Sequence, residues 1–168
     1  MVGIRSWTVE DAPALAACLN NPRVQDNLRD GMPFPYTAAD GVAYITNLLT
    51  EDTDRQFAWA VTLDGAVVGS IGVTRQVNVH RLTAEMGYSL AEGYWGRGIM
   101  TEAVVQVCDW LFAHTDLERI FAEPYAFNVG SCRVLEKAGF ELEGRMRRNA
   151  IKKGVVVDMF LYARVREG

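Results

Sequence analysis

The pattern of hydrophobic and polar positions changes its period several times along the chain, and each period predicts a different element. Some segments carry apolar residues at helical spacing, whereas others alternate and are rich in β-branched and aromatic residues, as half-buried strands are. The predicted helices cover residues 9–19, 41–49, 99–114 and 130–138. The predicted strands cover residues 4–7, 57–63, 67–77, 83–90, 119–125, 143–151 and 155–165. A meander of strands, a strand–helix–strand unit and a final hairpin predict an α+β domain with a mixed sheet.

Short polar signals mark where these elements start and turn. Thr8 with Asp11, and Thr37 with Asp40, have the spacing of a capping box at the start of a helix. Asp64-Gly65 is a strong signal for a two-residue turn, so we expect the strands on either side of it to form a hairpin.

The segment from Asn20 to Tyr36 is the most irregular part of the chain, because it contains Pro22, Gly31, Pro33 and Pro35. It predicts a long structured loop or a pair of short helices. Such a segment can shape a binding site or can be a plain connector.

Composition and the chain start narrow the class of protein. With 168 residues, of which 49% are hydrophobic and 23% charged, the chain can bury a full core, and we expect one domain over residues 1–168. No apolar run approaches the roughly 18 residues of a membrane span. Arg5, Glu10 and Asp11 lie where a signal peptide would need apolar residues, so a cytoplasmic protein without a membrane partner is expected.

Charge and cysteine content exclude further classes. The net charge of −4 opposes general nucleic-acid binding. One basic segment, residues 145–153, is either a solvated strand or a contact for an anionic ligand or substrate. Cys18, Cys108 and Cys132 are far apart and predict reduced core thiols. With only two histidines, the chain predicts no zinc or other metal site.

The stretch Gly93-Tyr94-Trp95-Gly96-Arg97-Gly98 lies between a predicted strand and a predicted helix. At such a junction the unpaired amides and the helix dipole both favour an anion. The glycine order is the reverse of the dinucleotide fingerprint, and Ile99-Met100 replaces the Lys-Ser/Thr of a Walker loop. The spacing alone therefore leaves a phosphate site and a tight structural turn as equal alternatives.

Four blocks in order resemble the GNAT N-acetyltransferases, and more narrowly their RimJ/RimL branch, which acetylates N-terminal α-amines of ribosomal proteins. The blocks are Ala84–Ala91, Tyr94–Ala103, Asn128–Ser131 and Leu135–Phe140. The resemblance covers nearly the whole chain. It implies the GNAT acyl-CoA N-acyltransferase fold, with a mixed, mostly antiparallel sheet whose parallel strands splay apart at the CoA site. It also implies acetyl-CoA as the cosubstrate, with no metal.

The resemblance implies that the glycine loop cradles the pyrophosphate of CoA. Gly93 stands where the family motif usually starts with Gln or Arg, a mild departure because the loop works mainly through backbone amides. The implied CoA-binding residues of the loop and the following helix are Trp95, Gly96, Arg97, Gly98, Met100 and Thr101.

The pantetheine arm is implied to lie between the splayed strands. The backbone of Ser89, Leu90 and Ala91 would contact it, and an N–H near Leu90 would polarise the thioester carbonyl. Asn128 matches a family position that hydrogen-bonds pantetheine. An N-cap for the helix that follows is its alternative role.

Direct attack of an amine on acetyl-CoA needs a neutral amine and a proton for the leaving thiolate. Glu85 is the candidate base, at the position where histone acetyltransferases of the superfamily carry a catalytic glutamate; a residue on the polar face of a strand is the alternative. Ser131 is the candidate acid, as in RimL-like enzymes, with a helix cap as the alternative. Leu135 and Ala150 stand where relatives carry a catalytic tyrosine and a second glutamate.

The resemblance favours a protein or peptide N-terminal α-amine as the acceptor, reaching the site between the Asn20–Tyr36 segment and the C-terminal hairpin. Two alternatives remain open. One is an acetyltransferase of small amines such as polyamines or aminoglycosides, which Asp26, Asp30 and Asp40 would suit. The other is a module that binds acetyl-CoA without turnover. The C-terminal hairpin could also extend a sheet across a two-fold axis, so a homodimer is expected.

Overall fold

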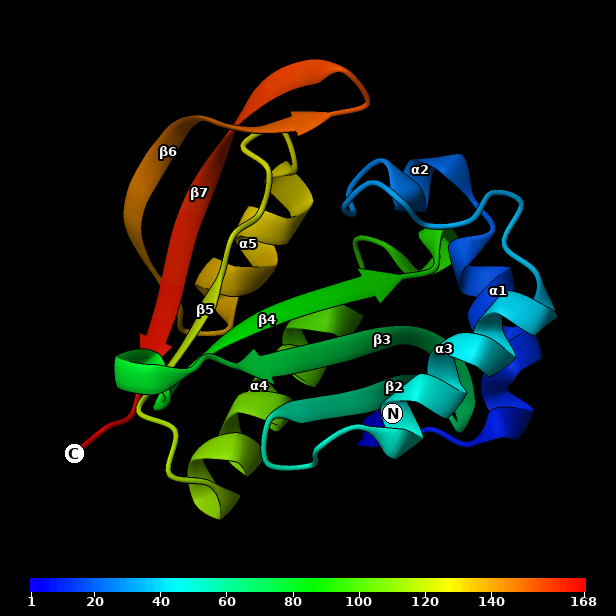
Figure 1. Ribbon diagram of the computed structural model, residues 1–168, viewed down its shortest axis with the longest axis horizontal. Helices are drawn as coiled ribbons and strands as arrows, with labels where there is room; N and C mark the ends of the chain where they lie inside the picture. Colours follow the sequence, from blue (N-terminus) through cyan, green and yellow to red (C-terminus); the bar gives the residue numbers. More distant parts are fainter.

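The computed structural model describes residues 1–168 and contains a seven-stranded sheet with helices on both faces (Figure 1). The strand order is β1-β2-β3-β4-β5-β7-β6, and only the β4–β5 pair is parallel. The strands are β1 (Val2–Arg5), β2 (Gln56–Leu63), β3 (Ala66–Arg75), β4 (Thr83–Leu90), β5 (Arg119–Ala122), β6 (Glu141–Lys152) and β7 (Val155–Val165). The helices are α1 (Ala12–Leu19), α2 (Pro22–Gln25), α3 (Ala38–Thr50), α4 (Ile99–His114) and α5 (Val129–Lys137). The predicted α+β class with a mixed, mostly antiparallel sheet is confirmed.

Four strands, β1, β3, β5 and β6, differ from the predictions by two residues or more at an end, and for β1 and β5 the physical reason is clear. The first strand was expected over residues 4–7, but β1 covers Val2–Arg5 and Trp7 leaves the sheet to become a core residue, 4% exposed. β5 ends at Ala122 and not at Tyr125, because Pro124 has no N–H to give to a ladder. The apolar character of Trp7 therefore led to a wrong boundary for the first strand. Pro124, inside the predicted fifth strand, explains why β5 ends early.

Both predicted capping boxes form. The Thr37 hydroxyl accepts a hydrogen bond from the Asp40 amide at 3.3 Å, and the Asp40 carboxylate accepts one from the Thr37 amide at 2.8 Å. The Asp11 carboxylate accepts from the Thr8 amide at 2.9 Å and from both Arg5 guanidinium nitrogens at 2.8 Å. These bonds, Arg5 first, lower the pKa of Asp11 to about 2. A 3₁₀ turn, Val9–Asp11, precedes α1 where a continuous helix was predicted.

The irregular segment from Asn20 to Tyr36 contains one short helix, α2, and a structured loop. The Gln25 side chain holds the two ends of this segment together, since its amide donates to the carbonyls of Leu19 at 3.0 Å and Pro33 at 2.9 Å. The segment is thus a structured loop, as predicted, and Figure 1 shows it facing the β6–β7 hairpin.

A hydrophobic core lies on each face of the sheet. The larger packs α4 and α5 against it, and the smaller packs α1 and α3 against the opposite face. Cys18, Cys108 and Cys132 are free and buried, as predicted, and burial raises the pKa of Cys108 to about 12. None of the helices combines the length and the apolar character that crossing a bilayer requires.

Candidate active site

The two parallel strands at the centre of the sheet separate along their length. β4 and β5 pair at Thr83 with Arg119, Ala84 with Ile120 and Glu85 with Phe121, after which β5 ends and β4 continues to Leu90. Figure 1 shows β5 turning away from β4 beyond this point. A cavity of about 1200 Å³ passes through the opening and is lined from both faces of the sheet.

The alternation of the β3–β4 ladder decides which backbone groups of β4 face this opening. The amide of Ala91 donates to the Val68 carbonyl at 2.9 Å, so in the same register Ser89 turns its N–H toward β3. Tyr88 and Leu90 then direct theirs toward the opening. The Trp95 indole donates to the Leu90 carbonyl at 2.8 Å. Among the residues expected to contact pantetheine, Leu90 is therefore the one that offers a free N–H.

The glycine loop presents a run of unpaired amides. None of the six N–H groups from Gly96 to Thr101 donates to an acceptor within the protein, whereas the Trp95 amide bonds to the Glu92 carbonyl at 3.1 Å. Gly96 and Gly98 both have φ of +74°, the left-handed conformation that only glycine adopts without strain. Helix α4 begins directly after Gly98, so the positive end of its dipole adds to the same spot. This loop can hold an anion such as a pyrophosphate.

Three cations from the glycine loop and α5 line the cavity, of which Arg97 was predicted and Arg133 and Lys137 were missed in the sequence. Arg97 lies over the Tyr94 ring at 5.4 Å, and Arg133 and Lys137 are one turn apart on α5. The signal was present, because an i, i+4 pair of cations follows Asn128 at helical spacing.

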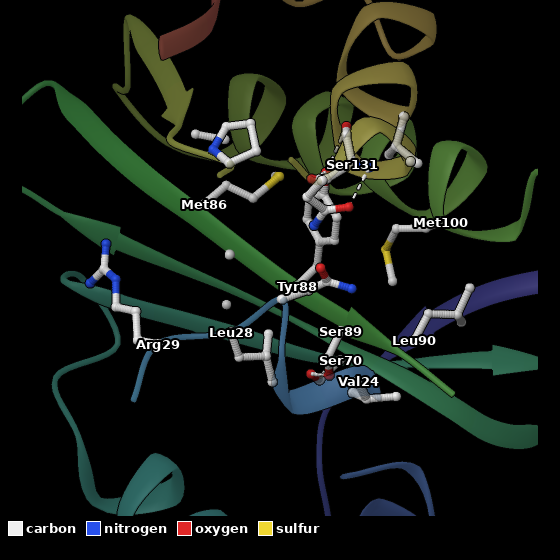
Figure 2. Close-up of a pocket in the computed structure, with 18 of the residues that line it drawn as sticks. Val24, Leu28, Arg29, Ser70, Met86, Tyr88, Ser89, Leu90, Met100 and Ser131 are labelled. Atoms are coloured by element: carbon white, nitrogen blue, oxygen red, sulfur yellow. Dashed lines mark hydrogen bonds between the residues drawn. The ribbon is translucent and has the colours of Figure 1, made fainter. Parts of the chain in front are cut away.

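Asn128 and Ser131 do not share the cap of α5. The Asn128 side chain accepts from the Ser131 amide at 3.2 Å, which makes Asn128 the N-cap. The Ser131 hydroxyl instead lies 2.6 Å from the hydroxyl of Tyr88 on β4 (Figure 2). Burial raises the pKa of Tyr88 well above its ordinary value, so its hydroxyl stays protonated at neutral pH. The position of Tyr88 beside Ser131 was not predicted.

Two carboxylates lie where the strands part. Glu85, whose side chain is 24% exposed, accepts from the Arg29 guanidinium at 2.7 Å. Glu123 follows the end of β5 and lines the same cavity. Burial, followed by the negative charge of Glu85, raises the pKa of Glu123, while Arg29 acts in the opposite direction. Glu123 was missed because the predicted strand ran past it.

Asp26, Asp30 and Asp40, the acids considered for a polycationic acceptor, already have partners within the protein. Lys152 and Lys153 pair with Asp30 at 2.8 Å and with Asp26 at 2.7 Å, and Asp40 lies in the capping box of α3. The two ion pairs also join the loop after α2 to the β6–β7 hairpin. They cross the route by which the acceptor was expected to reach the site.

Residues 2–141 match the acetyltransferase (GNAT) domain family. The chain belongs to the GNAT acetyltransferase family. A probable N-acetyltransferase of Bacillus subtilis, YjcK, is 39% identical over 110 residues, which are 66% of this chain and 61% of that protein. An uncharacterised N-acetyltransferase of Bacillus licheniformis, p20, is 28% identical over 95% of this chain and 90% of its own length.

The fold is similar to that of RimJ from Mycobacterium smegmatis, solved in complex with CoA-disulfide. The TM-score is 0.88 with 26% identity, over 98% of this chain and 81% of that one. The geometry of this chain also fits CoA without that likeness. The unpaired loop amides, together with Arg97, Arg133 and Lys137, suit the phosphates of CoA. The unpaired edge of β4 suits its extended, amide-containing pantetheine arm. This GNAT acetyltransferase thus has a cavity whose lining is suited to CoA.

Proposed function

We propose that this acetyltransferase transfers the acetyl group of acetyl-CoA directly to a primary amine, the N-terminal α-amine of a peptide or protein. The observation that carries the choice of acceptor is the charge of the cavity. Its acids are Asp30, Glu85 and Glu123, of which the first two are in ion pairs and the third is partly buried. Such a cavity suits an acceptor with one amine better than a polyamine or an aminoglycoside, whose several charges need several free carboxylates.

An α-amine also lowers the demand on a base. Its pKa of about 8 leaves a part neutral at physiological pH, whereas a lysine amine with a pKa of about 10.4 is almost fully charged. The α-amine therefore needs less proton removal before it can attack. The resemblance to the RimJ/RimL branch and the similarity to the RimJ fold support the same acceptor.

Residues from the loop and α5 bind and orient acetyl-CoA in this proposal. The amides of Gly96 to Thr101 receive the pyrophosphate, with Arg97, Arg133 and Lys137 neutralising phosphate charge. The Leu90 N–H donates to the thioester oxygen, where negative charge develops as the amine attacks. Fixing amine and thioester next to each other supplies most of the acceleration.

The proposed base and the proposed acid lie on different elements beside the opening between β4 and β5. The amine nitrogen loses a proton to Glu85 or Glu123, directly or through a water, as the new C–N bond forms. The C–S bond breaks, and the Ser131 hydroxyl donates to the departing sulfur. The Tyr88 hydroxyl at 2.6 Å holds Ser131 in place and can return a proton to it. The reaction is balanced, since the nitrogen loses one proton and the sulfur gains one.

An acetyl-CoA consumption screen tests this function. The panel contains peptides with free N-termini, the same peptides with blocked N-termini and an internal lysine, polyamines and aminoglycosides. We expect turnover only with the free N-termini. Comparable rates on lysine peptides or on polycations would replace the proposed acceptor, and binding of acetyl-CoA with no turnover on any amine would favour a module that binds without catalysis.

We further propose that the enzyme works in the cytoplasm, where its cosubstrate is made, as a homodimer. Support for the dimer comes from exposed apolar side chains on the β6–β7 hairpin. Ile151, Val155 and Val156 are 65%, 62% and 46% exposed, and β6 is an edge strand. Burying these side chains against a second copy would remove an apolar surface and an open edge together.

A further inference from the structure

The cavity continues beyond the point where the strands part. From Glu85 it extends between the sheet and the helices α1 and α3, reaching Leu15 on α1 and Leu48 on α3. This part, here named the acceptor arm, lies on the face of the sheet that carries Glu85, away from helix α4. An amine at Glu85 would place the group attached to it in the acceptor arm.

The floor of the acceptor arm is nearly bare backbone. In the strand register Ala58 lies opposite Gly72, and Gly72 lies opposite Gly87, so three strands in a row contribute one methyl group between them. A Cβ built on Gly72 or Gly87 would meet no atom within 4 Å. Glycine inside a strand weakens it and marks places where another group approaches the backbone closely.

Polar residues bound this floor at both ends. On one side, Thr74 and Glu85 lie in the neighbouring cross-strand row. On the other, the hydroxyls of Ser70 and Ser89 lie 2.7 Å apart (Figure 2). Strand spacing makes the bare row about 7 Å wide along the strands and about 10 Å long across them. These dimensions match an aromatic ring or a branched aliphatic chain lying flat on the sheet.

The remaining walls of the arm are apolar or aromatic. They include Leu28, Tyr36, Tyr44 and Leu48, and burial raises the pKa of Tyr36 to about 12. Figure 2 draws Leu28, on the loop after α2, and Ser70, on β3, among the residues that line the cavity. The charged groups near its mouth are the Arg29–Glu85 pair, Glu123, and Asp30 in its pair with Lys152; beyond them the lining is apolar or uncharged. The arm therefore offers little to replace the hydration of a charged side chain.

We propose that the acceptor arm binds the first side chain of the acceptor and selects one that is large and uncharged, aromatic or long aliphatic. This inference rests on the proposed function for its peptide substrate. A large apolar side chain gains by leaving water and fills the arm, whereas a glycine acceptor leaves the arm empty and a charged one loses its hydration. Gly72 and Gly87 are the specificity-determining residues, because any side chain there would occupy the space.

The test compares peptides that differ only at the first residue: Phe, Leu, Gly, Glu and Lys. For the wild-type enzyme we expect kcat/KM for Phe and Leu to exceed that for the other three by about tenfold or more. Gly87→Val should lower kcat/KM for the Phe peptide by about tenfold or more, mainly through KM, and change it for the Gly peptide by less than about threefold. Acetyl-CoA affinity, measured by calorimetry, should stay at the wild-type value.

Gly144→Val is the matched control. Gly144 is also a strand glycine with open space at its Cβ, but it lies on β6 outside the cavity, so both peptides should react as with wild type. Valine suits a strand, and both variants should fold. A wild-type enzyme without preference for the first residue would overturn the inference, and so would a Gly87→Val variant that slows both peptides equally.

Free monoamines separate this inference from the proposed function. If no peptide reacts but phenethylamine exceeds ethylamine by about tenfold, and Gly87→Val removes the difference, the peptide acceptor is wrong and the specificity of the arm stands. If neither peptides nor monoamines show the preference, the inference fails whichever amine is acetylated.

Discussion

The hydroxyls of Tyr88 and Ser131 lie 2.6 Å apart, with one on β4 and the other on α5. These two elements flank the opening through which the cavity passes. A Tyr88 hydroxyl that donates to Ser131 leaves the proton of Ser131 free to point at the departing sulfur. The pair therefore turns a serine in the first turn of a helix into an oriented donor.

Removing this donor should slow the chemical step. Ser131→Ala should lower kcat by about 10- to 1000-fold, because the thiolate leaves without a proton, and higher pH should not restore the rate. Tyr88→Phe keeps Ser131 and should cost less, with the acetyl-CoA affinity unchanged. The checks are steady-state kinetics across pH and calorimetry. A wild-type kcat in Ser131→Ala would remove the pair from the mechanism.

The neighbouring Cys132 supplies a control on the same helix. Its thiol is buried, and burial raises its pKa, so it is a poor nucleophile. Cys132→Ala should retain nearly wild-type kcat. A folded Cys132→Ala variant that binds CoA but has no activity would point to an acetyl-cysteine intermediate and overturn direct transfer.

The glycine loop should be sensitive to any side chain at Gly96. Its φ of +74° makes Gly96→Val strained by about 1–2 kcal/mol, and the side chain would crowd the unpaired amides. We expect CoA affinity to fall by about tenfold or more while the protein stays folded. Gly93→Val, in the same loop without a positive φ, is the control and should bind CoA as wild type does. Equal affinity in the Gly96 variant would contradict the pyrophosphate assignment.

The Arg5–Asp11 pair should contribute to acid stability. The pKa of Asp11 falls from 3.8 to about 2 in the folded protein, so its stabilisation is present above about pH 4 and is lost as the pH falls toward 2. Asp11→Asn should cost about 1.5–3 kcal/mol in the free energy of unfolding at neutral pH. The difference from wild type should disappear in acid. Urea unfolding at several pH values measures it, with the exposed Glu10→Gln as the control.

Much of the fold could be predicted because its signals are local. The strand before the glycine loop, the loop itself and helix α4 follow from alternation, from glycine spacing and from the apolar stripe of one helix. The capping boxes at Thr8 and Thr37 likewise involve side chains three residues apart. Trp7 shows the limit of this reasoning, since its apolar character is equally consistent with a strand and with the core residue that it is.

The parts of the site that were missed depend on register and tertiary contact. Tyr88 meets Ser131 only because α5 packs beside the open edge of β4, 43 residues further along the chain. The facing of Gly72 and Gly87 follows from the β3–β4 register, which no local pattern fixes. Glu123 enters the cavity because β5 ends one residue before it. Motif spacing could select Glu85 and Ser131, but it could not show which groups surround them.

The exposed hairpin leads to a prediction about assembly. A homodimer should scatter light as a particle of about twice the 18.7 kDa chain mass. Ile151→Glu places a charge among the exposed apolar residues of β6 and β7 and should shift the protein toward monomers. Val79→Glu, at a 79% exposed site between β3 and β4, should leave the mass unchanged. Wild-type protein that remains monomeric at micromolar concentrations would end this proposal.

Glu85 and Glu123, the two carboxylates where β4 and β5 separate, are alternative candidates for the base that accepts the proton of the amine. Glu85→Gln and Glu123→Gln each keep the shape of the side chain and remove proton acceptance. Loss of the true base should lower kcat by about 10- to 1000-fold, with partial recovery at higher pH as more of the amine becomes neutral.

The pH profiles of the wild type and of Glu85→Gln distinguish a base at Glu123 from a base at Glu85. The pKa of Glu123 is raised by burial and by Glu85, so a base at Glu123 is protonated, and inactive, at a higher pH than an ordinary glutamate. Glu85→Gln removes the negative charge beside Glu123 and should move that acid limb to lower pH. Loss of the acid limb in Glu85→Gln, together with wild-type kcat in Glu123→Gln, would assign the proton transfer to Glu85. An acid limb that stays in place in both variants would assign it to solvent.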